Sequence, residues 1–598
     1  MNLGIDFGST YSMLSVYDPA NDTVQPLILE SGSPYIPSIA CYDEEGNLIT
    51  GHSVKEQIGY LPPDVRLFRA FKMLLTAHPE RDRQTLLERG YTDEVTPGTI
   101  TQEFLRQQIE IAKEHYRVEK FDNLVICIPE VWDTELHTMG GRDTLLKICR
   151  KLNAAEHITV VTEPAAASAY FAHNYWKNYQ KPYQGKILIV DYGGGTLDIT
   201  LADVHTTGGT HMEIQTLWQT GAGDNHPVKS AGNHTDGDTE HVQVGDAGIA
   251  YMEEAVRLAL RAVSMDVPPE KDVGFLRLFT QLESALINNA GKFSTQCKKY
   301  KSNPKKLGTD EGVFVILYGE GKRIPVTYAM LYQAYQNMIY PVLDRQLDII
   351  IEKIRSKLNI DPVRALPAGQ DDFKIALVGG FGQFYLVRQQ LEEKFHLTSA
   401  RDARLRGLDE QGANGVPLDN GQARAICYGA ALLAADVLTM HKTALYSIGL
   451  VYTDGGQDTF DFAILKGSEL QYGEVYYVLN RKQHCPRKMF YSGPSSSGST
   501  WRFAFWREEG SGRAYNLKPC EKVQHYLENS IPANSDYIYG FSMDSSGVYT
   551  LHIYGLDYSR KDGVGEEVTR LSLGNLSDFV GANIDLTNCK YLEKPAQK

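Results

Sequence analysis

The stretch LGIDFGSTYSMLSV, residues Leu3–Val16, runs from an apolar strand to an aspartate, Asp6, and then into a turn of glycine and hydroxyl residues. A second stretch, ILIVDYGGGTLDITLADV (Ile187–Val204), repeats this plan around Asp191. In both, an alternating strand follows the turn. The repetition predicts two similar hairpins, each with an aspartate where its first strand ends.

These turns have the composition of a phosphate site. Glycine lets the backbone approach a ligand closely, and consecutive free N–H groups form a concavity that binds anions. An aspartate beside that concavity would repel phosphate unless a cation lay between them. Two facing hairpins would therefore hold a phosphate chain with Mg²⁺, with Asp6 and Asp191 as metal-binding residues. The alternative is that both aspartates cap tight turns, which two identically placed copies disfavour.

Size and charge narrow the class of protein. The chain has 598 residues, which favours roughly three or four folding units. Its hydrophobic content of 42% and charged content of 22% are typical of globular proteins. The net charge of −14, without a run of Lys or Arg, predicts no nucleic-acid partner.

The cysteines and the apolar runs predict a cytoplasmic protein. Eight cysteines are scattered singly, which is neither a zinc pattern nor a disulfide framework and suits a reducing compartment. The first strand begins directly after Met1, which leaves no room for a signal peptide. No apolar run approaches the roughly 20 residues that span a bilayer, so no membrane partner is expected.

The pattern of apolar and polar residues changes near residue 440. Before it, strand-like runs at Leu124–Pro129, Lys186–Tyr192 and Phe373–Gly380 alternate with helical spacing, which predicts an α/β domain over 1–438. The helical spacing includes LFRAFKMLLTA (Leu67–Ala77). After a linker at 437–442, alternating aromatic strands predict a mostly antiparallel β domain over 443–598.

One segment, Gly223–His241, looks inserted. It contains His226, His234 and His241 with several aspartates, so a metal site is one interpretation. Its lack of periodicity favours a loop.

Five motifs together resemble a known family. GIDFGSTYS, EPAAASAY (Glu163–Tyr170), DYGGGTLD, LVGGFGQ and CYGAALLA occur in the order and spacing of the actin-like ATPase superfamily, and more narrowly of the DnaK-type 70-kDa heat-shock chaperones. The resemblance implies a two-lobed actin-like (ribonuclease-H-like) ATPase domain, with lobe I at about 1–185 and 419–438 and lobe II at about 186–418. A β-sandwich domain would follow.

The resemblance also implies ATP or ADP with Mg²⁺ as cofactors, and it assigns roles to residues. The phosphates would be bound by Gly8, Ser9, Thr10 and Tyr11 from one lobe and by Gly193, Gly194, Gly195 and Thr196 from the other. The catalytic residues would be Lys72, Glu163, Thr196 and Asp198, with the lysine near the γ-phosphate. Taken alone, Lys72 fits a solvated helix face and Glu163 fits the first turn of a helix that begins at Pro164.

The base-binding end departs from the family. Gly379 and Gly380 would lie against base or ribose, but Phe381 and Gln383 replace a small hydroxyl residue and an arginine. In the expected adenosine-binding helix, Leu282–Ser294, only Glu283 matches, or in another register Lys292 and Ser294. Gln422, Ala423 and Arg424 replace Pro-Asp-Glu. Phosphate chemistry is therefore predicted to be intact, and base recognition to have diverged.

The C-terminal segment TALYSIGLVYTDGG (Thr443–Gly456) is similar to the start of the family's peptide-binding domain. Trp501, Phe503 and Phe505 share one side of a strand, which either faces the core or lines a peptide groove. The chain ends at Lys598, which predicts a β domain without a helical lid, and VLTMHK (Val437–Lys442) is less apolar than the family's linker.

The resemblance thus predicts a divergent chaperone that hydrolyses ATP slowly. Its partners would be an unfolded peptide or a specific protein client, with a possible cochaperone or nucleotide-exchange factor. The alternatives are a scaffold that binds nucleotide without hydrolysis and docks one dedicated partner, an actin-like filament former, and a sugar kinase.

Overall fold

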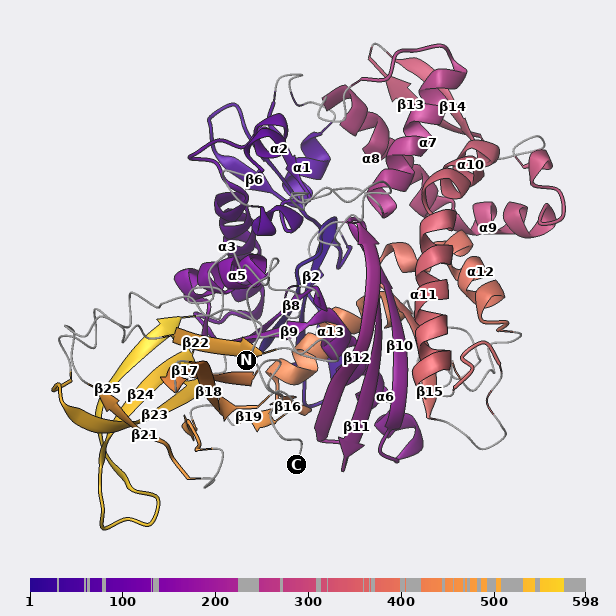
Figure 1. Cartoon of the computed structure of the whole chain (residues 1–598). Coiled ribbons are helices and arrows are strands. Elements are labelled where there is room, and N and C mark those ends of the chain that lie inside the picture. Colours follow the sequence, from indigo (N-terminus) through magenta and orange to yellow (C-terminus); the bar gives the residue numbers. More distant parts are fainter. Residues whose placement is uncertain are drawn as a thin grey trace. The chain divides into compact units, whose positions relative to one another are not determined.

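The computed structural model groups the chain into two compact units, which are Met1–Asp133 with Thr144–Met440 and Thr134–Asp143 with His441–Lys598 (Figure 1). It describes residues 1–28, 32–58, 61, 65–77, 82–130, 132, 139–223, 247–268, 273–307, 313–319, 321–358, 360–364, 366, 372–397, 404, 421–443, 447–454, 457–465, 468–470, 474–480, 485–491, 502–506, 531–543 and 549–574. The inserted segment after Gly223 and the predicted aromatic Trp501 lie outside these ranges.

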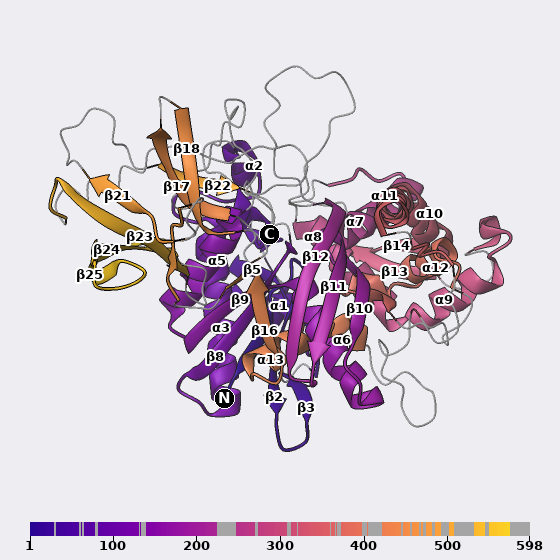
Figure 2. The same ribbon diagram turned by 60° about the horizontal axis from the view of Figure 1, so that its bottom comes forward.

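The first unit contains two sheets built on the same pattern (Figures 1 and 2). In one, β1 (Leu3–Asp6) pairs antiparallel with β2 (Tyr11–Asp18) and parallel with β8 (Phe121–Ile128). In the other, β10 (Gln184–Tyr192) pairs antiparallel with β11 (Thr196–Thr207) and parallel with β15 (Phe373–Val378). The duplicated sequence motif therefore corresponds to a duplicated strand topology.

Further strands extend both sheets. The first sheet continues to β3 (Thr23–Pro26) on one side and β9 (Ala155–Thr162) on the other, and β4 (Ile36–Pro37) also pairs with β2. The second continues to β12 (His211–Gly223), beside which the backbone N–H of Thr439 in β16 (Thr439–Thr443) donates to Thr210 O at 2.8 Å. The predicted linker thus includes the start of a strand.

Two helices rich in small residues, α6 (Glu163–Tyr179) and α13 (Gly421–Ala434), pack closely together and against the strands. A Cβ added at Gly429 would lie 1.7 Å from the carbonyl oxygen of Ala166, and one added at Gly4 would lie 2.3 Å from the backbone N of Ala431. Only glycine permits these approaches. The small residues of EPAAASAY and CYGAALLA therefore serve packing as well as any chemistry.

The remaining elements of the first unit surround the sheets. Beside the first sheet lie β5 (Ile39–Tyr42), β6 (Leu48–Thr50), β7 (Leu67–Arg69), α1 (His52–Gln57), α2 (Arg83–Glu88), α3 (Pro97–Tyr116) and α5 (Met139–Leu152). The second sheet is accompanied by α7 (Gly248–Ala262), α8 (Val273–Asn288), α9 (Ala290–Lys299), β13 (Val313–Tyr318), β14 (Lys322–Thr327), α10 (Tyr328–Met338), α11 (Tyr340–Leu358) and α12 (Tyr385–Lys394).

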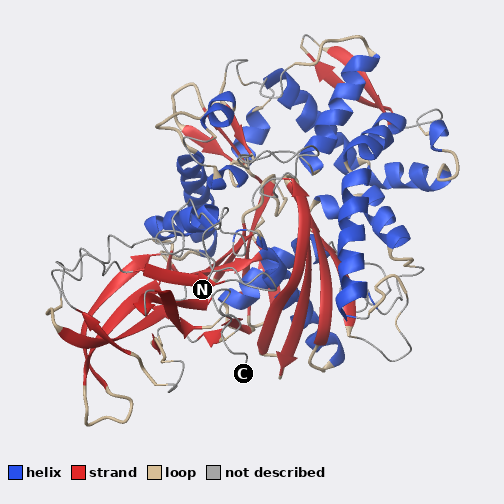
Figure 3. Cartoon of the chain, in the orientation of Figure 1, coloured by secondary structure: helices blue, strands red, loops and turns tan. Residues whose placement is uncertain are grey.

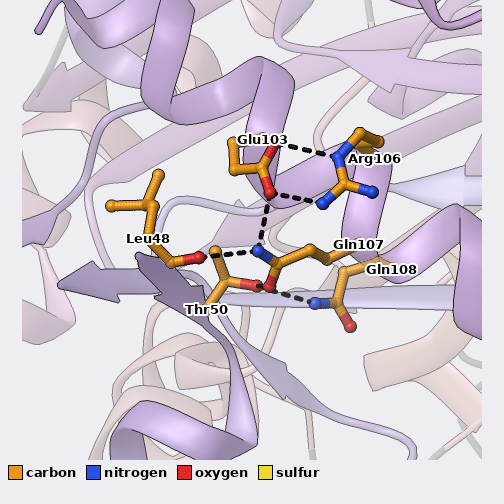
Figure 4. A network of polar contacts seen from close by, with 6 residues as sticks. All are labelled: Leu48, Thr50, Glu103, Arg106, Gln107 and Gln108. Atoms are coloured by element: carbon orange, nitrogen blue, oxygen red, sulfur yellow. Dashed lines mark hydrogen bonds and ion pairs between the residues drawn. The ribbon is translucent and has the colours of Figure 1, made fainter. Parts of the chain in front are cut away.

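A polar network joins α3 to β6 (Figure 4). Gln107 Nε2 donates to the carbonyl oxygen of Leu48 at 2.7 Å and to Glu103 Oε1 at 2.8 Å, while Gln107 Oε1 accepts from Thr50 Oγ1 at 2.7 Å. The same glutamate pairs with Arg106 at 2.6 Å. The network holds the small sheet of β5, β6 and β7 against the long helix.

The helix predicted over Leu67–Ala77 is wrong. This segment forms β7 and, after Ala70 at a φ of 51°, a short 3₁₀ turn over Met73–Thr76. Phe68, Phe71 and Leu74 are all buried, so the segment is surrounded by core rather than amphipathic. Arg69 and Lys72 are three positions apart, as on the polar side of an amphipathic helix, so periodicity alone predicts a helix here.

In the second unit, every described element from β17 onward is a strand (Figure 3). One antiparallel sheet has the order β18 (Gln457–Ile464), β17 (Ser447–Asp454), β22 (Arg502–Trp506), and the latter contains Phe503 and Phe505. The other has the order β20 (Tyr476–Tyr477), β23 (Ser535–Met543), β24 (Tyr549–Leu556), β25 (Val564–Gly574), with β21 (Lys488–Tyr491) also paired to β23. Ile448, Leu450, Phe541 and Leu551 contribute to one core that both sheets share.

None of the described helices is both long enough and apolar enough to cross a bilayer.

Candidate active site

The two predicted turns lie where β1 and β10 end, and local hydrogen bonds fix both. In the first, the Ser38 hydroxyl donates to the Gly8 carbonyl oxygen at 2.7 Å. A Cβ at Gly8 would lie 2.0 Å from the Tyr11 carbonyl oxygen, so this turn requires glycine. In the second, which also contains Gly195, Gly193 N donates to Thr196 O at 3.0 Å.

The second turn is also held by the start of α7. The backbone N–H of Ile249 donates to the Gly194 carbonyl oxygen at 2.8 Å, and that of Gly248 donates to the Gly193 carbonyl oxygen at 3.3 Å. Because α7 donates hydrogen bonds to these two carbonyl oxygens, the backbone conformation of the turn is stabilised by the protein itself.

The two turns meet each other. A Cβ at Gly194 would lie 1.5 Å from Oγ1 of Thr10, so the threonine occupies the place where a side chain would be. This Oγ1 atom is buried and has no hydrogen-bond partner among the described residues. A buried hydroxyl without a partner is costly, and an anion or water bound between the turns would satisfy it.

Lys72 and Glu163 form a buried ion pair between the hairpins. Lys72 Nζ lies 2.5 Å from Glu163 Oε1, and the side chains are 4% and 8% exposed. Lys72 precedes the 3₁₀ turn at Met73, and Glu163 is the first residue of α6. Glu163 therefore begins a helix, as one interpretation predicted, and also faces the lysine. Lys72 is not part of a solvated face.

Burial and mutual repulsion raise the pKa values of two carboxyl groups near this pair. Burial, and then the charge of Glu163, raise the pKa of Asp6 to about 7, against the attraction of Lys72. Burial, and then Glu163 and Asp198, hold the pKa of Asp191 well above its usual range. Burial opposes the charge of Lys72, but Glu163 and Asp6 outweigh it and raise the lysine pKa.

This charge distribution fits a bound cation. In the described part of the site, Asp6, Glu163, Asp191 and Asp198 share a single lysine. Asp191 and Asp198 are directly paired in the β10–β11 ladder. The described residues include no group of three or more His, Cys, Asp or Glu side chains placed to ligate one metal ion. Mg²⁺ keeps most of its water shell and needs few direct carboxylates, and the oxygen atoms of the paired Asp191 and Asp198 are of the type that it binds.

Gly379 brings a third backbone segment to the same place. It follows β15 with a φ of 79°, and a Cβ there would lie 2.4 Å from Asp191 Oδ1. A glycine is required on both counts. Gly380 is different, since a Cβ there would meet no atom within 4 Å.

The predicted residue Glu283 reaches the first turn from α8. Its Oε2 accepts a hydrogen bond from the Tyr11 hydroxyl at 2.6 Å, and Lys55 Nζ lies 2.9 Å from that hydroxyl and 3.5 Å from the carboxylate. In the alternative register, Lys292 is exposed and Ser294 donates to the Gly291 carbonyl oxygen. Of the three candidates Glu283, Lys292 and Ser294, Glu283 is therefore the one that contacts the first turn, through Tyr11.

A pocket of about 60 Å³ opens beside this trio, and its lining includes Ser9, Thr10, Tyr11, Lys55, Arg69, Phe279 and Glu283. Pockets for small molecules usually measure at least about 300 Å³. The pocket as it stands is therefore smaller than most small-molecule sites.

An aromatic cluster surrounds Phe381, in the segment that follows β15. Phe381 stacks on Phe384 with ring centroids 5.3 Å apart, and Phe384 stacks on Phe293 at 5.6 Å. Tyr192 and Tyr251 pack against Phe381 at 5.2 and 5.4 Å. The expected continuous helix is interrupted at Asn289, between α8 and α9, which places Phe293 in this cluster. Phe381 is thus partly buried and packs against the hydrophobic core beside the second sheet.

Sequence reasoning missed several of these partners. Ser38 and Lys55 belong to no motif, and their contacts with Gly8 and Tyr11 arise from the fold alone. The contact between Thr10 and Gly194 was also missed, although three consecutive glycines after a buried strand do signal a close approach.

No family model matches the chain. Chaperone protein DnaK of Mycoplasmopsis agalactiae is 29% identical over 226 residues, which are 37% of this chain and 32% of that protein. Heat shock cognate 70 kDa protein 3 of Dictyostelium discoideum is 25% identical over 35% of this chain and 36% of its own length. A ribosome-associated molecular chaperone of Zygosaccharomyces rouxii is 25% identical over 55% of this chain and 56% of its own length.

The matches thus span between about a third and just over half of these relatives. They confirm the predicted resemblance, and the chain is a distant relative of the DnaK and 70-kDa heat-shock chaperones. Its mixed α/β architecture with several sheets agrees with that relationship.

Proposed function

We propose that this protein binds ATP with Mg²⁺, hydrolyses it slowly, and couples its nucleotide state to a peptide or protein partner bound by the C-terminal unit. One observation carries the proposal, which is the buried Lys72–Glu163 pair between two aspartate-ended hairpins. Such a cluster is not needed for folding stability, because a buried ion pair often stabilises a protein no more than apolar side chains of similar volume.

The roles of the residues follow from their positions. The backbone N–H groups of the two turns would bind the phosphates, and Lys72 would neutralise charge that develops on the terminal phosphate. Asp6 and Asp191 would hold Mg²⁺ through its water shell, and the ion supplies charge neutralisation and orientation. Glu163 and Asp198 would orient the attacking water, and Thr196 would contact the phosphates.

The proposed partners follow from the second unit and from the relatives. Two antiparallel sheets with a shared core support a β-sandwich that presents an edge or groove to an extended peptide. A specific client, a cochaperone and a nucleotide-exchange factor are further proposed partners. The six described cysteines are free thiols, which supports a reducing, cytoplasmic location.

Turnover and binding are to be measured together. Hydrolysis of ATP with Mg²⁺ is compared among the wild type, Lys72→Ala and Thr196→Ala, while calorimetry measures ATP binding. The proposal expects Mg²⁺-dependent turnover in the wild type alone. Binding without turnover above that of Thr196→Ala would instead identify a nucleotide-dependent scaffold, and failure to bind would refute the nucleotide site.

A further inference from the structure

The second unit contains a serine, a histidine and a glutamate joined in series. Ser542 Oγ lies 2.7 Å from His552 Nε2, and His552 Nδ1 lies 2.5 Å from Glu567 Oε1. The three residues come from β23, β24 and β25, which are adjacent in one sheet.

The strand register explains how they meet. Ser542 pairs with Thr550, and His552 pairs with Gly540, so the serine and histidine are diagonal neighbours on one face of the sheet. Register shifts on both sides of Tyr554 bring Glu567 opposite that tyrosine and within reach of the imidazole. The alternate residues Phe541, Leu551 and Ile553 face the core.

The contacts are compatible with the arrangement that activates a serine. In the tautomer with a proton on Nδ1, the Glu567 carboxylate accepts the Nδ1–H hydrogen bond, and the lone pair of Nε2 accepts from the Ser542 hydroxyl. Ser542 and His552 are only 8% and 7% exposed, which keeps water from competing for these bonds. A nucleophile, a base and a group that orients the base thus lie in the order that activates a serine.

An aromatic surface lies beside the imidazole. The ring of Tyr554 stacks on His552 at 6.3 Å with an interplanar angle of 17°, and the ring of Tyr477 contacts Tyr554 at 5.4 Å. Both tyrosines are half-buried, so each leaves part of its surface accessible. Such a surface suits an aryl or short acyl group.

We propose that Ser542 is the nucleophile of a second active site, which hydrolyses esters of short or aryl acyl groups. Ser542 Oγ bonds to the acyl carbon while its proton passes to His552 Nε2. The bond from carbon to the alcohol oxygen then breaks, and the alcohol leaves with that proton. In the second step His552 Nε2 takes a proton from water while the water oxygen bonds to the acyl carbon. The bond from that carbon to Ser542 Oγ then breaks, the acid leaves, and the proton passes from Nε2 to Oγ. Glu567 is a positioning residue that acts through His552.

The test uses the full chain with a fluorophosphonate probe and 4-nitrophenyl acetate. Peptide mapping is expected to find the probe on Ser542, and Ser542→Ala to lose both labelling and ester hydrolysis. His552→Gln, which preserves hydrogen bonding, is expected to slow hydrolysis by about 10²- to 10⁴-fold, as loss of a general base does. Glu567→Gln should lower kcat and leave KM unchanged.

Ser535→Ala, on the same strand, serves as the matched control and should behave as wild type. A wild-type protein that leaves Ser542 unlabelled would overturn the proposal, because a purely structural network needs no reactive serine. Hydrolysis that persists in Ser542→Ala would overturn it as well. Thermal unfolding of each variant identifies any loss that comes from misfolding.

Discussion

Two regions of the first unit differ in the kinds of groups that they contain: the region of the two glycine turns and the aromatic region around Phe381. Around the phosphate turns, backbone groups, glycines and buried charges converge from β1, β10, α6 and the loop after β15. Around Phe381, stacked aromatic rings pack against the hydrophobic core beside the second sheet. At the first region, charge and backbone geometry limit which amino acids can be substituted, and at the second region the limit is the volume that packs into the core.

The contrast indicates which half of the site can change without loss of the reaction. A glycine whose Cβ would collide with backbone, or a lysine that neutralises a buried carboxylate, has no substitute of similar shape and charge. Aromatic and aliphatic side chains can replace one another in a core when volume is kept. We therefore expect large effects at the phosphate end and small ones at the aromatic end.

The largest effect is expected from Lys72→Ala. The change leaves Glu163 buried without its cation, which costs about 3–5 kcal/mol of folding free energy. Loss of the charge that faces the phosphates should reduce hydrolysis at least about 100-fold. Denaturant unfolding and steady-state turnover measure the two quantities. The double variant Lys72→Ala/Glu163→Gln should regain stability without regaining turnover, and turnover near the wild-type value in either variant would contradict the assignment.

The pH dependence of the metal-free protein tests the acidic cluster. The pKa of Asp6 is about 7 in the folded protein and near 3.8 when exposed, so the folded state binds its proton more tightly. Stability should therefore fall as pH rises from about 4 to 7, by up to a few kcal/mol, and level off above. Mg²⁺ should oppose this loss because it favours the charged form. Unfolding curves across this range are expected to flatten in Asp6→Asn, and an unchanged slope would exclude Asp6 as the cause.

A matched glycine pair tests the contact between the two turns. In Gly194→Ala the new Cβ would meet Thr10 at 1.5 Å, whereas in Gly193→Ala the nearest atom is 3.8 Å away. Overpacking of this kind lowers the free energy of unfolding by about 1–3 kcal/mol. We expect Gly194→Ala to lower the unfolding temperature and weaken ATP binding, and Gly193→Ala to change little. Equal effects of both changes would mean that the turns do not depend on this contact.

The smallest effect concerns the base. The rings of Phe381 and Phe384, which pack against the core, present no hydrogen-bonding group that could select one base over another. ATP and GTP should therefore differ in affinity by less than about tenfold, or 1.4 kcal/mol. Competitive calorimetry measures the difference. A strong preference for ATP would show that polar groups still select the base.

The sequence predicted those features of the fold that depend on residues adjacent in the chain. The strands around Asp6 and Asp191 and their turns could be predicted because a buried strand, an aspartate and a glycine turn are adjacent in the chain. The helix expected around Lys72 was wrong because Arg69 and Lys72 have the spacing of an amphipathic helix, whereas the segment forms β7 and a 3₁₀ turn with Lys72 buried. Contacts such as Tyr11 with Glu283, which are 272 positions apart, depend on the packing of lobes and leave no local pattern.

The strand β12 has a mechanical consequence. One end of it pairs Gly223 with Thr196 in the second turn, and the other end lies where Thr210 accepts a hydrogen bond from Thr439. The ladder to β11 spans roughly 40 Å between these ends, at about 3.3 Å per residue, and is interrupted once, by a bulge between Leu201 and Ala202. A displacement at Thr439 would therefore reach the turn through two paired segments that meet at this bulge.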